Sequence, residues 1–317
     1  MDCMVARERT AGARRECLAQ MFRRHVPDGR EVRRCVGPEQ VGVSHLHALD
    51  CFWSDCRSAT RGLPSCTRID RFLQPSCTRF RIMRVILFDL DDTLFDHQHC
   101  SRAGLVAVQE AYAGRIDGSI DEVESAYREL LEQWHERVLN GSMSIDESRI
   151  ERFRELLSNE HAVATDEESQ AAARCYRDAY DAAYRPVPGA IELLQRVKTE
   201  HRIGIVTNHV VSEQVKKIAT IGVEPFVDEM VVSEDVGVAK PDSRIFEAAL
   251  SRLGGTPNEA VMIGDSWSSD ILGATEMGIR AIWLNRYDRP CPDSSLATEI
   301  PSLKPVDDVV DLMLGTS

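Results

Sequence analysis

Residues Val85–Thr93 read VILFDLDDT: four apolar residues and then, at once, acidic ones. A short uninterrupted apolar run is typical of a strand buried on both faces of a parallel sheet, and open α/β sheets bind their ligands at the carboxyl ends of such strands. Asp89 and Asp91 would share one face if the extended geometry continued through them, and two close carboxylates repel each other unless a cation lies between them. Oxygen ligands of this kind suit Mg²⁺. An acidic turn after a strand is the alternative for this segment alone.

Three later segments place polar residues at the ends of apolar runs or in turns: RIGIVTN at 202–208, GVAKPD at 237–242 and AVMIGDSWSSD at 260–270. The first ends in Thr207 and Asn208, a hydroxyl and an amide that can contact phosphate oxygens. The second holds Lys240 before a proline suited to the first turn of a helix. The third is another buried-strand pattern, which stops at Asp265 and has Asp270 five residues later. Taken singly, these features are also explained by strand ends, a solvated lysine and helix caps.

Taken in this order, the four segments resemble the signature of the haloacid dehalogenase-like hydrolase superfamily, in the phosphatase branch that carries a helical cap. The resemblance covers the chain from about Val85 to the C-terminus, roughly three quarters of its length. Each motif alone is weak, but all four behind apolar runs and in the family's order make a specific pattern. The matching positions are Asp89, Asp91 and Thr93 for DxDxT, Thr207 with Asn208, Lys240 with Pro241, and Asp265 with Asp270 for GDxxxxD.

The resemblance implies a phosphoryl-transfer mechanism with named roles. Asp89 would be the nucleophile that forms an aspartyl-phosphate, which splits one difficult step into two easier ones. Asp91 would protonate the leaving oxygen and later take a proton from the attacking water. Thr207, Lys240 and the backbone N–H of Asn208 would hold the phosphate oxygens, over which charge is spread as the group moves.

The resemblance also implies Mg²⁺ as the cofactor. Asp89 and Asp265 would bind the ion through their carboxylates and Asp91 through its backbone carbonyl, while Asp270 would act through water or orient the loop. Thr93 is expected to support the site. A divalent cation in this position neutralises the repulsion between the nucleophile and the phosphate.

Composition and charge narrow the class of protein. The 317 residues carry a net charge of −13, which argues against a nucleic acid as partner. No apolar run approaches the ~18 residues of a membrane helix, and the first residues lack the apolar stretch of a secretion signal. We therefore expect a soluble cytoplasmic enzyme, monomeric or homodimeric, whose partner is a small phosphorylated metabolite.

Residues 1–82 differ in composition from the rest of the chain. They hold 15 Arg, no Lys and 9 acidic residues, a net charge of +6, whereas residues 83–317 carry −19. With no sustained helical or strand period, this part is predicted to be a poorly ordered extension, or sequence upstream of the true start. We expect the active enzyme to begin near Met83. A zinc site is the alternative, although its ligands would match no recognised spacing: His45, His47, Cys51 and Cys56.

The long segment between the first two motifs is expected to be an α-helical insertion, residues 97–187. Three capping-box patterns of the form Ser/Thr-x-x-Glu each precede a helical stretch, and they begin at Ser119, Ser144 and Thr165. With a further helix near residues 100–112, they predict four helices. The position resembles the family's cap, a lid that excludes water and recognises the part of the substrate that does not react.

Residues 83–96 and 188–317 are predicted to form the catalytic core. Strands and helices alternate along it in lengths typical of a parallel sheet with helices on both faces. The expected strands lie near 202–207, 229–232, 260–264 and 280–284, and the expected helices near 188–200, 212–221, 242–253, 268–277 and 304–314. The predicted fold class is therefore α/β: a doubly wound, Rossmann-like parallel sheet with an inserted α-helical cap domain.

The expected function is a Mg²⁺-dependent phosphomonoesterase acting on a metabolite of the nucleotide, sugar phosphate or phosphoglycolate type. A 2-haloacid dehalogenase using the same nucleophile is the second enzymatic alternative, but it would need neither metal nor a second aspartate, so Asp91 and Asp265 oppose it. A phosphonate hydrolase would need a cap lysine, and residues 96–187 contain none. A non-catalytic regulatory protein on the same fold stays an alternative, although no catalytic residue is missing. The residues do not distinguish hydrolysis from mutase or phosphotransferase activity.

Overall fold

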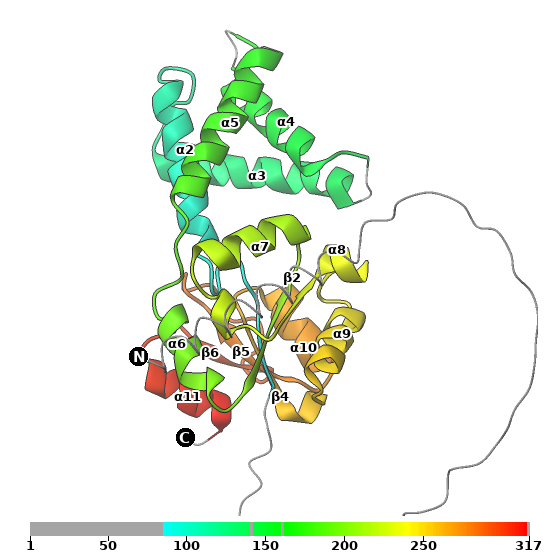
Figure 1. The fold of residues 1–317 in the computed structure, drawn as a ribbon. Helices are drawn as coiled ribbons and strands as arrows, with labels where there is room; N and C mark the ends of the chain where they lie inside the picture. The colour runs from blue at the N-terminus through cyan, green and yellow to red at the C-terminus, as the bar shows by residue number, and fades with distance from the viewer. Residues whose placement is uncertain (1–84, 140–141, 160–161, 316–317) are drawn as a thin grey trace, which may run out of the picture. The chain divides into compact units, whose positions relative to one another are not determined.

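The structure of the chain, a computed structural model, describes residues 85–139, 142–159 and 162–315. These residues build a parallel sheet, the helices around it and a group of four further helices (Figure 1). The predicted extension at 1–82, the expected start near Met83 and the alternative zinc site lie outside the described residues.

Six strands form a fully parallel sheet in the order β3-β2-β1-β4-β5-β6. Their bounds are β1 (Val85–Phe88), β2 (Arg202–Thr207), β3 (Glu229–Val232), β4 (Ala260–Gly264), β5 (Arg280–Leu284) and β6 (Ala297–Ile300). All four residues of β1 are buried, which explains why its sequence is apolar without alternation. Val85 pairs with Arg202 on one side and Ala260 on the other, so the carboxyl ends of β1, β2 and β4 meet at one edge.

Helices cover both faces of this sheet. They are α6 (Ala190–Lys198), α7 (Val211–Thr220), α9 (Ser243–Leu253), α10 (Leu272–Glu276) and α11 (Val306–Leu314). Ile86 and Phe88 of β1 belong to the core on the side of α6 and α11, whereas Val85 and Leu87 pack with residues of α9 and α10 on the other side (Figure 1). Successive side chains of β1 therefore face alternate sides of the sheet, and each side is an apolar layer. The predicted doubly wound α/β class is confirmed.

Four helices lie between β1 and α6 in the chain: α2 (His97–Ala111), α3 (Ile120–Leu139), α4 (Ile145–Leu157) and α5 (Asp166–Ala182). At Ser144 and Thr165 the predicted capping boxes are complete, because each hydroxyl accepts from the glutamate N–H three residues on and that carboxylate accepts from the cap N–H. Ser119 makes the same reciprocal contacts. The helices share an aromatic core in which the rings of Tyr127 and Tyr176 lie 5.4 Å apart. The four predicted helices are present.

The sheet has a sixth strand, β6, that the sequence pattern does not predict. It pairs with β5 at the edge of the sheet, and its residues Thr298 and Glu299 are exposed. An edge strand with so little burial lacks the apolar run that marks the other strands. Three short helical segments are also absent from the prediction: η1 (Glu224–Phe226), α8 (Ser233–Val236) and η2 (Pro257–Glu259).

Two predicted helices begin differently in the structure. The helix expected at 268–277 opens with a π-helical turn, η3 (Trp267–Ile271), before the short α10. Pro241 was expected in the first turn of a helix, but α9 starts at Ser243 with Asp242 as its N-cap, so the proline precedes the helix. The Asp242 carboxylate accepts a backbone N–H of the first turn, and this capping contact sets where the helix begins.

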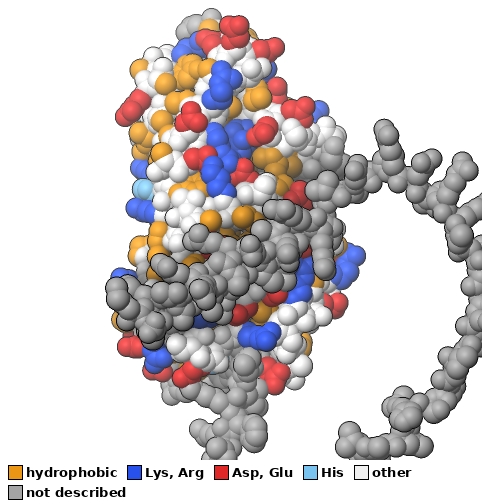
Figure 2. Space-filling model, in the orientation of Figure 1, with side chains coloured by type: hydrophobic (Ala, Val, Ile, Leu, Met, Phe, Trp, Pro, Cys, Tyr) orange, Lys and Arg blue, Asp and Glu red, His pale blue; other side chains and the backbone are white. Residues whose placement is uncertain are grey.

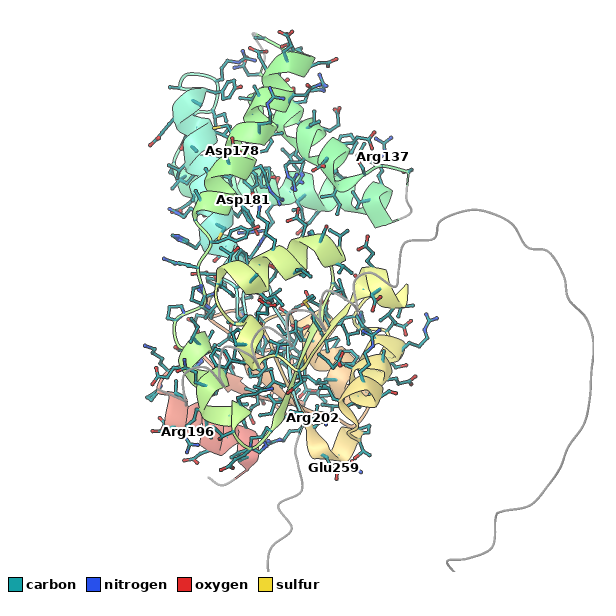
Figure 3. All side chains as sticks on the ribbon, in the orientation of Figure 1. Arg137, Asp178, Asp181, Arg196, Arg202 and Glu259 are labelled. Atoms are coloured by element: carbon teal, nitrogen blue, oxygen red, sulfur yellow. The ribbon has the colours of Figure 1, made fainter. Side chains whose placement is uncertain are left out.

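Charged side chains join the four-helix insertion to the core. Arg177 of α5 contacts Glu213 of α7 at 2.5 Å, and Lys216 of α7 contacts Asp181 of α5 at 2.5 Å. Asp181 is labelled on α5 in Figure 3. Helix α7 therefore holds α5 through two ion pairs.

The surface of the described residues is mixed in charge. On the face shown in Figure 2, Lys and Arg side chains are interspersed with Asp and Glu. Within residues 85–139, 142–159 and 162–315, no helix combines the length and the hydropathy that a bilayer crossing requires.

Replacement of the α5 cap, Thr165→Ala, should lower the free energy of unfolding by about 1 kcal/mol, because the Glu168 N–H in the first turn loses its acceptor. Urea unfolding followed by circular dichroism measures this change. Ser251→Ala, at an exposed position of α9, is the control and should alter stability little. Equal stability of the two variants would contradict the capping role.

Candidate active site

The predicted site residues gather at the carboxyl edge of the sheet. Asp89 directly follows β1, and its N–H donates to a carbonyl of β4 at 2.9 Å, so the strand pairing continues up to the site. Thr207 ends β2, and Asp265 follows β4. Figure 3 labels Arg202 and Glu259, which lie at the opposite, amino ends of β2 and β4. The parallel topology thus brings together motifs that are far apart in the chain.

Three carboxylates form an acidic cluster, defined by Asp89, Asp265 and Asp270. Each offers an oxygen, and these oxygens lie within 4.8 Å of one another. Asp89 is 6% exposed and Asp270 is fully buried, so the charges are held away from water. The sequence predicts that Asp270 acts through water or orients the loop, and the structure places its carboxylate in the cluster itself. Hard oxygen ligands at this spacing suit a divalent cation.

The ammonium of Lys240 lies between two of these carboxylates. Its Nζ is 2.6 Å from Oδ1 of Asp89 and 2.6 Å from Oδ1 of Asp270. Burial acts to lower the pKa of Lys240, but Asp270 and Asp89 outweigh it and the net shift is upward, so the lysine stays charged. The Asn208 amide donates to the Lys240 carbonyl at 3.0 Å and accepts from its N–H at 2.7 Å. The Asn208 side chain therefore supports Lys240, a role that the sequence does not indicate.

Two cations contact the acidic cluster, Lys240 and Arg289, whose Nη2 lies 3.3 Å from Oδ2 of Asp265, and together they do not balance three carboxylates. Burial raises the pKa of Asp89, Lys240 opposes this rise, and Asp270 and Asp265 add to it, with a net upward shift. Burial, followed by the neighbouring Asp270 carboxylate, raises the pKa of Asp265 to about 7. The acidic cluster therefore has an excess of negative charge that a bound cation would stabilise.

A glycine and a wide helical turn bring Asp270 into the cluster. Its Oδ2 accepts from the N–H of Ser266 at 3.0 Å, and its own N–H donates to the Ser266 carbonyl at 2.9 Å across η3. A Cβ at Gly264 would lie 2.2 Å from Asp270 Oδ2, which is closer than such atoms approach. The glycine before Asp265 is therefore required for space at this point.

The chain turns after β1, so Asp89 and Asp91 do not lie on one strand face. β1 ends at Phe88, and Asp92 has a φ of +61°, in the left-handed region. The sequence places the two carboxylates on one face only if the extended geometry continues through them, and the strand ends before Asp89. The turn gives the two carboxylates different partners, Lys240 for Asp89 and side chains of α7 for Asp91.

The carboxylate of Asp91 is held on both oxygens. Lys217 Nζ lies 2.6 Å from Oδ1, and Gln214 Nε2 donates to Oδ2 at 3.0 Å. Nδ1 of His97 is 4.0 Å from Oδ1 and 2.7 Å from the Tyr180 hydroxyl. Burial acts to raise the pKa of Asp91, but Lys217 and His97 outweigh it and lower the pKa. The ionised carboxylate is thus the favoured form.

Two buried hydroxyls of the predicted site differ in their surroundings. Thr207 Oγ1 accepts from Gln214 Nε2 at 2.7 Å, which leaves the threonine's own hydrogen free to be donated. Thr93 Oγ1 has no hydrogen-bond partner within the described part of the chain. The supporting role of Thr93 stays a prediction.

Sequence reasoning missed Gln214 and Lys217, which contact Asp91, and Arg289, which contacts Asp265. Gln214 and Lys217 lie on the buried face of α7, 0% and 2% exposed, next to Ile218, where the helical period predicts apolar side chains. A polar residue at such a position needs an interior partner. That mismatch between period and polarity was the available signal.

The site places an aspartate, a buried lysine and further carboxylates at the carboxyl edge of a doubly wound sheet, and this arrangement is that of an α/β enzyme with an acidic active site. The particular family follows from the sequence match. A family profile described as haloacid dehalogenase-like hydrolase matches residues 83–278, and the chain belongs to this family.

Relatives and solved structures agree with this assignment. Glyceraldehyde 3-phosphate phosphatase of Methanothermobacter thermautotrophicus is 32% identical over 64% of this chain and 86% of its own. Pyrimidine 5'-nucleotidase YjjG of Escherichia coli is 30% identical over 67% of this chain and 91% of its own. The magnesium-bound structure of the HAD-hydrolase YfnB of Bacillus subtilis is 26% identical with a TM-score of 0.58, and the match covers 72% of this chain and 99% of that one.

Gly264→Ala should lower the free energy of unfolding by about 1–3 kcal/mol, because the added methyl group overlaps the Asp270 carboxylate and forces it to move. Chemical denaturation measures the loss. Ser268→Ala, an exposed position in the same loop, is the control and should be close to the parent protein. A Gly264→Ala variant as stable as the parent would contradict the requirement for glycine beside the Asp270 carboxylate.

Proposed function

We propose that this chain is a Mg²⁺-dependent phosphomonoesterase that hydrolyses a small phosphorylated metabolite through an aspartyl-phosphate. The observation that carries the proposal is the buried contact between Lys240 and Asp89 beside the acidic cluster. A carboxylate can approach a phosphate only when the charge of both is offset, and this site supplies a fixed cation next to the nucleophile. Phosphoryl transfer asks a protein mainly for such positioning and neutralisation. The phosphatase and nucleotidase names of the relatives support the reaction class.

Mg²⁺ fits the donor set of the acidic cluster. The carboxylates of Asp89, Asp265 and Asp270 are hard oxygen ligands, and the backbone carbonyl of Asp91 is the proposed further ligand. The excess of carboxylates over ammonium groups in this buried place favours a divalent cation. When bound, the ion supplies charge neutralisation between the nucleophile and the phosphate. Magnesium in the YfnB structure supports the choice of metal.

The side chains of this site account for both halves of a turnover. Asp91 takes up a proton when the anionic ester binds beside it, because a neighbouring negative charge raises the pKa of the carboxyl group. Asp89 then attacks phosphorus, the bond to the leaving oxygen breaks, and Asp91 donates its proton to that oxygen. Water then attacks the phosphorus of the aspartyl-phosphate and gives a proton to Asp91, and phosphate leaves with Asp89 restored. Asp91 thus regains in the second step the proton that it loses in the first. The Thr207 hydroxyl, the backbone N–H of Asn208 and Lys240 bind the phosphate oxygens.

The insertion supplies the groups on the leaving-group side. In this proposal residues 97–187 are the cap, and residues 83–96 with 188–317 are the core. His97 and Tyr180 form a hydrogen-bonded pair next to Asp91, a polar surface suited to a hydroxylated leaving group. A panel of nucleoside monophosphates, glyceraldehyde 3-phosphate, sugar phosphates and phosphoglycolate, assayed with Mg²⁺ for released phosphate, identifies the substrate.

Asp89→Asn should reduce hydrolysis of 4-nitrophenyl phosphate on the order of 10³-fold or more, because an amide cannot form the aspartyl-phosphate. Circular dichroism should show an intact fold. The matched control is Asp288→Asn, an exposed aspartate after β5, which should keep full activity. Substantial turnover by the Asp89 variant would remove this residue from the nucleophile role.

Chelation by EDTA should silence hydrolysis, and added Mg²⁺ should restore it. Asp265→Asn should weaken Mg²⁺ binding by about tenfold or more in isothermal titration calorimetry, because the acidic cluster loses one anionic ligand. Asp288→Asn again serves as the control. Hydrolysis of a 2-haloacid without metal, together with inactivity toward every phosphate ester, would contradict the proposal and support the dehalogenase alternative.

A further inference from the structure

Gln214 links two residues of the proposed mechanism through a single nitrogen. Its Nε2 donates to Oδ2 of Asp91 at 3.0 Å and to Oγ1 of Thr207 at 2.7 Å. A side-chain amide has two N–H groups, and here one serves the acid/base residue and the other the phosphate-binding hydroxyl. Gln214 is itself completely buried in α7, so its position is set by packing and not by solvent.

The two contacts constrain the orientation of both partners. Lys217, one helical turn after Gln214, holds the other carboxylate oxygen of Asp91 at 2.6 Å. With one donor on each oxygen, the Asp91 carboxylate is fixed in direction. Thr207 accepts from the amide, so its own hydrogen points elsewhere and is available to a phosphate oxygen.

The fold alone does not account for a glutamine at this position. The Oε1 atom of Gln214 is buried and has no hydrogen-bond partner among the described residues. A buried acceptor without a partner costs stability, whereas an apolar side chain on the same helix face would not. A residue that is unfavourable for folding and contacts two reacting groups is expected to serve the reaction.

We propose that Gln214 is a positioning residue for phosphoryl transfer. It holds the Asp91 carboxylate in line with the leaving oxygen and turns the Thr207 hydroxyl toward the phosphate. This inference rests on the proposed function and adds to it a residue outside the family motifs. Proton donation by Asp91 matters most for a poor leaving group, because a stable anion departs without a proton.

The test compares three aryl monoesters of increasing leaving-group quality: phenyl, 4-nitrophenyl and 2,4-dinitrophenyl phosphate. The variant is Gln214→Met, which keeps the length of the side chain but has no N–H donor. The matched control is Gln195→Met, the same change at an exposed position of α6. Values of kcat/KM report the attack by Asp89, and thermal denaturation reports the fold.

Gln214→Met should lower kcat/KM for phenyl phosphate by about tenfold or more, with a clearly smaller loss for 2,4-dinitrophenyl phosphate and no lowering of the melting temperature. Gln214→Glu, which keeps the shape but presents oxygens to Asp91, should show the same dependence on the leaving group. Gln195→Met should match the parent protein.

Equal losses across the three esters, or no loss, would overturn the positioning role even if the parent enzyme is fully active. A lower melting temperature with a uniform loss would likewise assign Gln214 to structure. Failure of the proposed function gives a different result, because the parent protein itself would then hydrolyse none of the esters and Asp89→Asn would change nothing.

Discussion

The structure of the site depends on holding like charges together in a buried place. Two unit charges about 4 Å apart interact by about 4 kcal/mol at an effective dielectric constant of about 20, so three adjacent carboxylates oppose folding unless they are compensated. Lys240 provides part of that compensation through 2.6 Å contacts with Asp89 and Asp270. The negative charge that is left attracts a cation. The same excess of negative charge that opposes folding therefore favours cation binding at the site, as the proposed reaction requires.

Uncharged features of the structure help to keep these groups in place. Parallel pairing of β1 with β2 and β4 brings their carboxyl ends to one edge of the sheet. The absence of a Cβ at Gly264 leaves room for the Asp270 carboxylate, and the wide turn of η3 lets the same carboxylate accept the Ser266 N–H. Asn208 pairs with both backbone groups of Lys240. Each feature concerns a few atoms, and each determines where a charge lies.

Helix α7 connects the site to the four-helix insertion. Its buried residues Gln214 and Lys217 face Asp91, while the adjacent Glu213 and Lys216 pair with charged residues of α5. Neighbouring residues on a helix point in different directions, so one short element makes both sets of contacts. The placement of the Asp91 carboxylate and the attachment of the insertion are therefore set by the same helix.

Local sequence patterns were sufficient for the fold class and for many of the side chains that gather at the candidate site. These patterns depend on residues that are close in the chain, such as the apolar run Val85–Phe88 or a capping box. The edge strand β6 was missed because little of it is buried, so its sequence has no apolar run. Tertiary structure alone decided which partner each polar group of the site meets. Asp91 and Lys217 are 126 positions apart in the chain, so no local sequence pattern predicts their contact. A polar residue on the buried face of a helix indicates that it needs a hydrogen-bond partner, but the identity of that partner depends on how the helix packs in the tertiary structure.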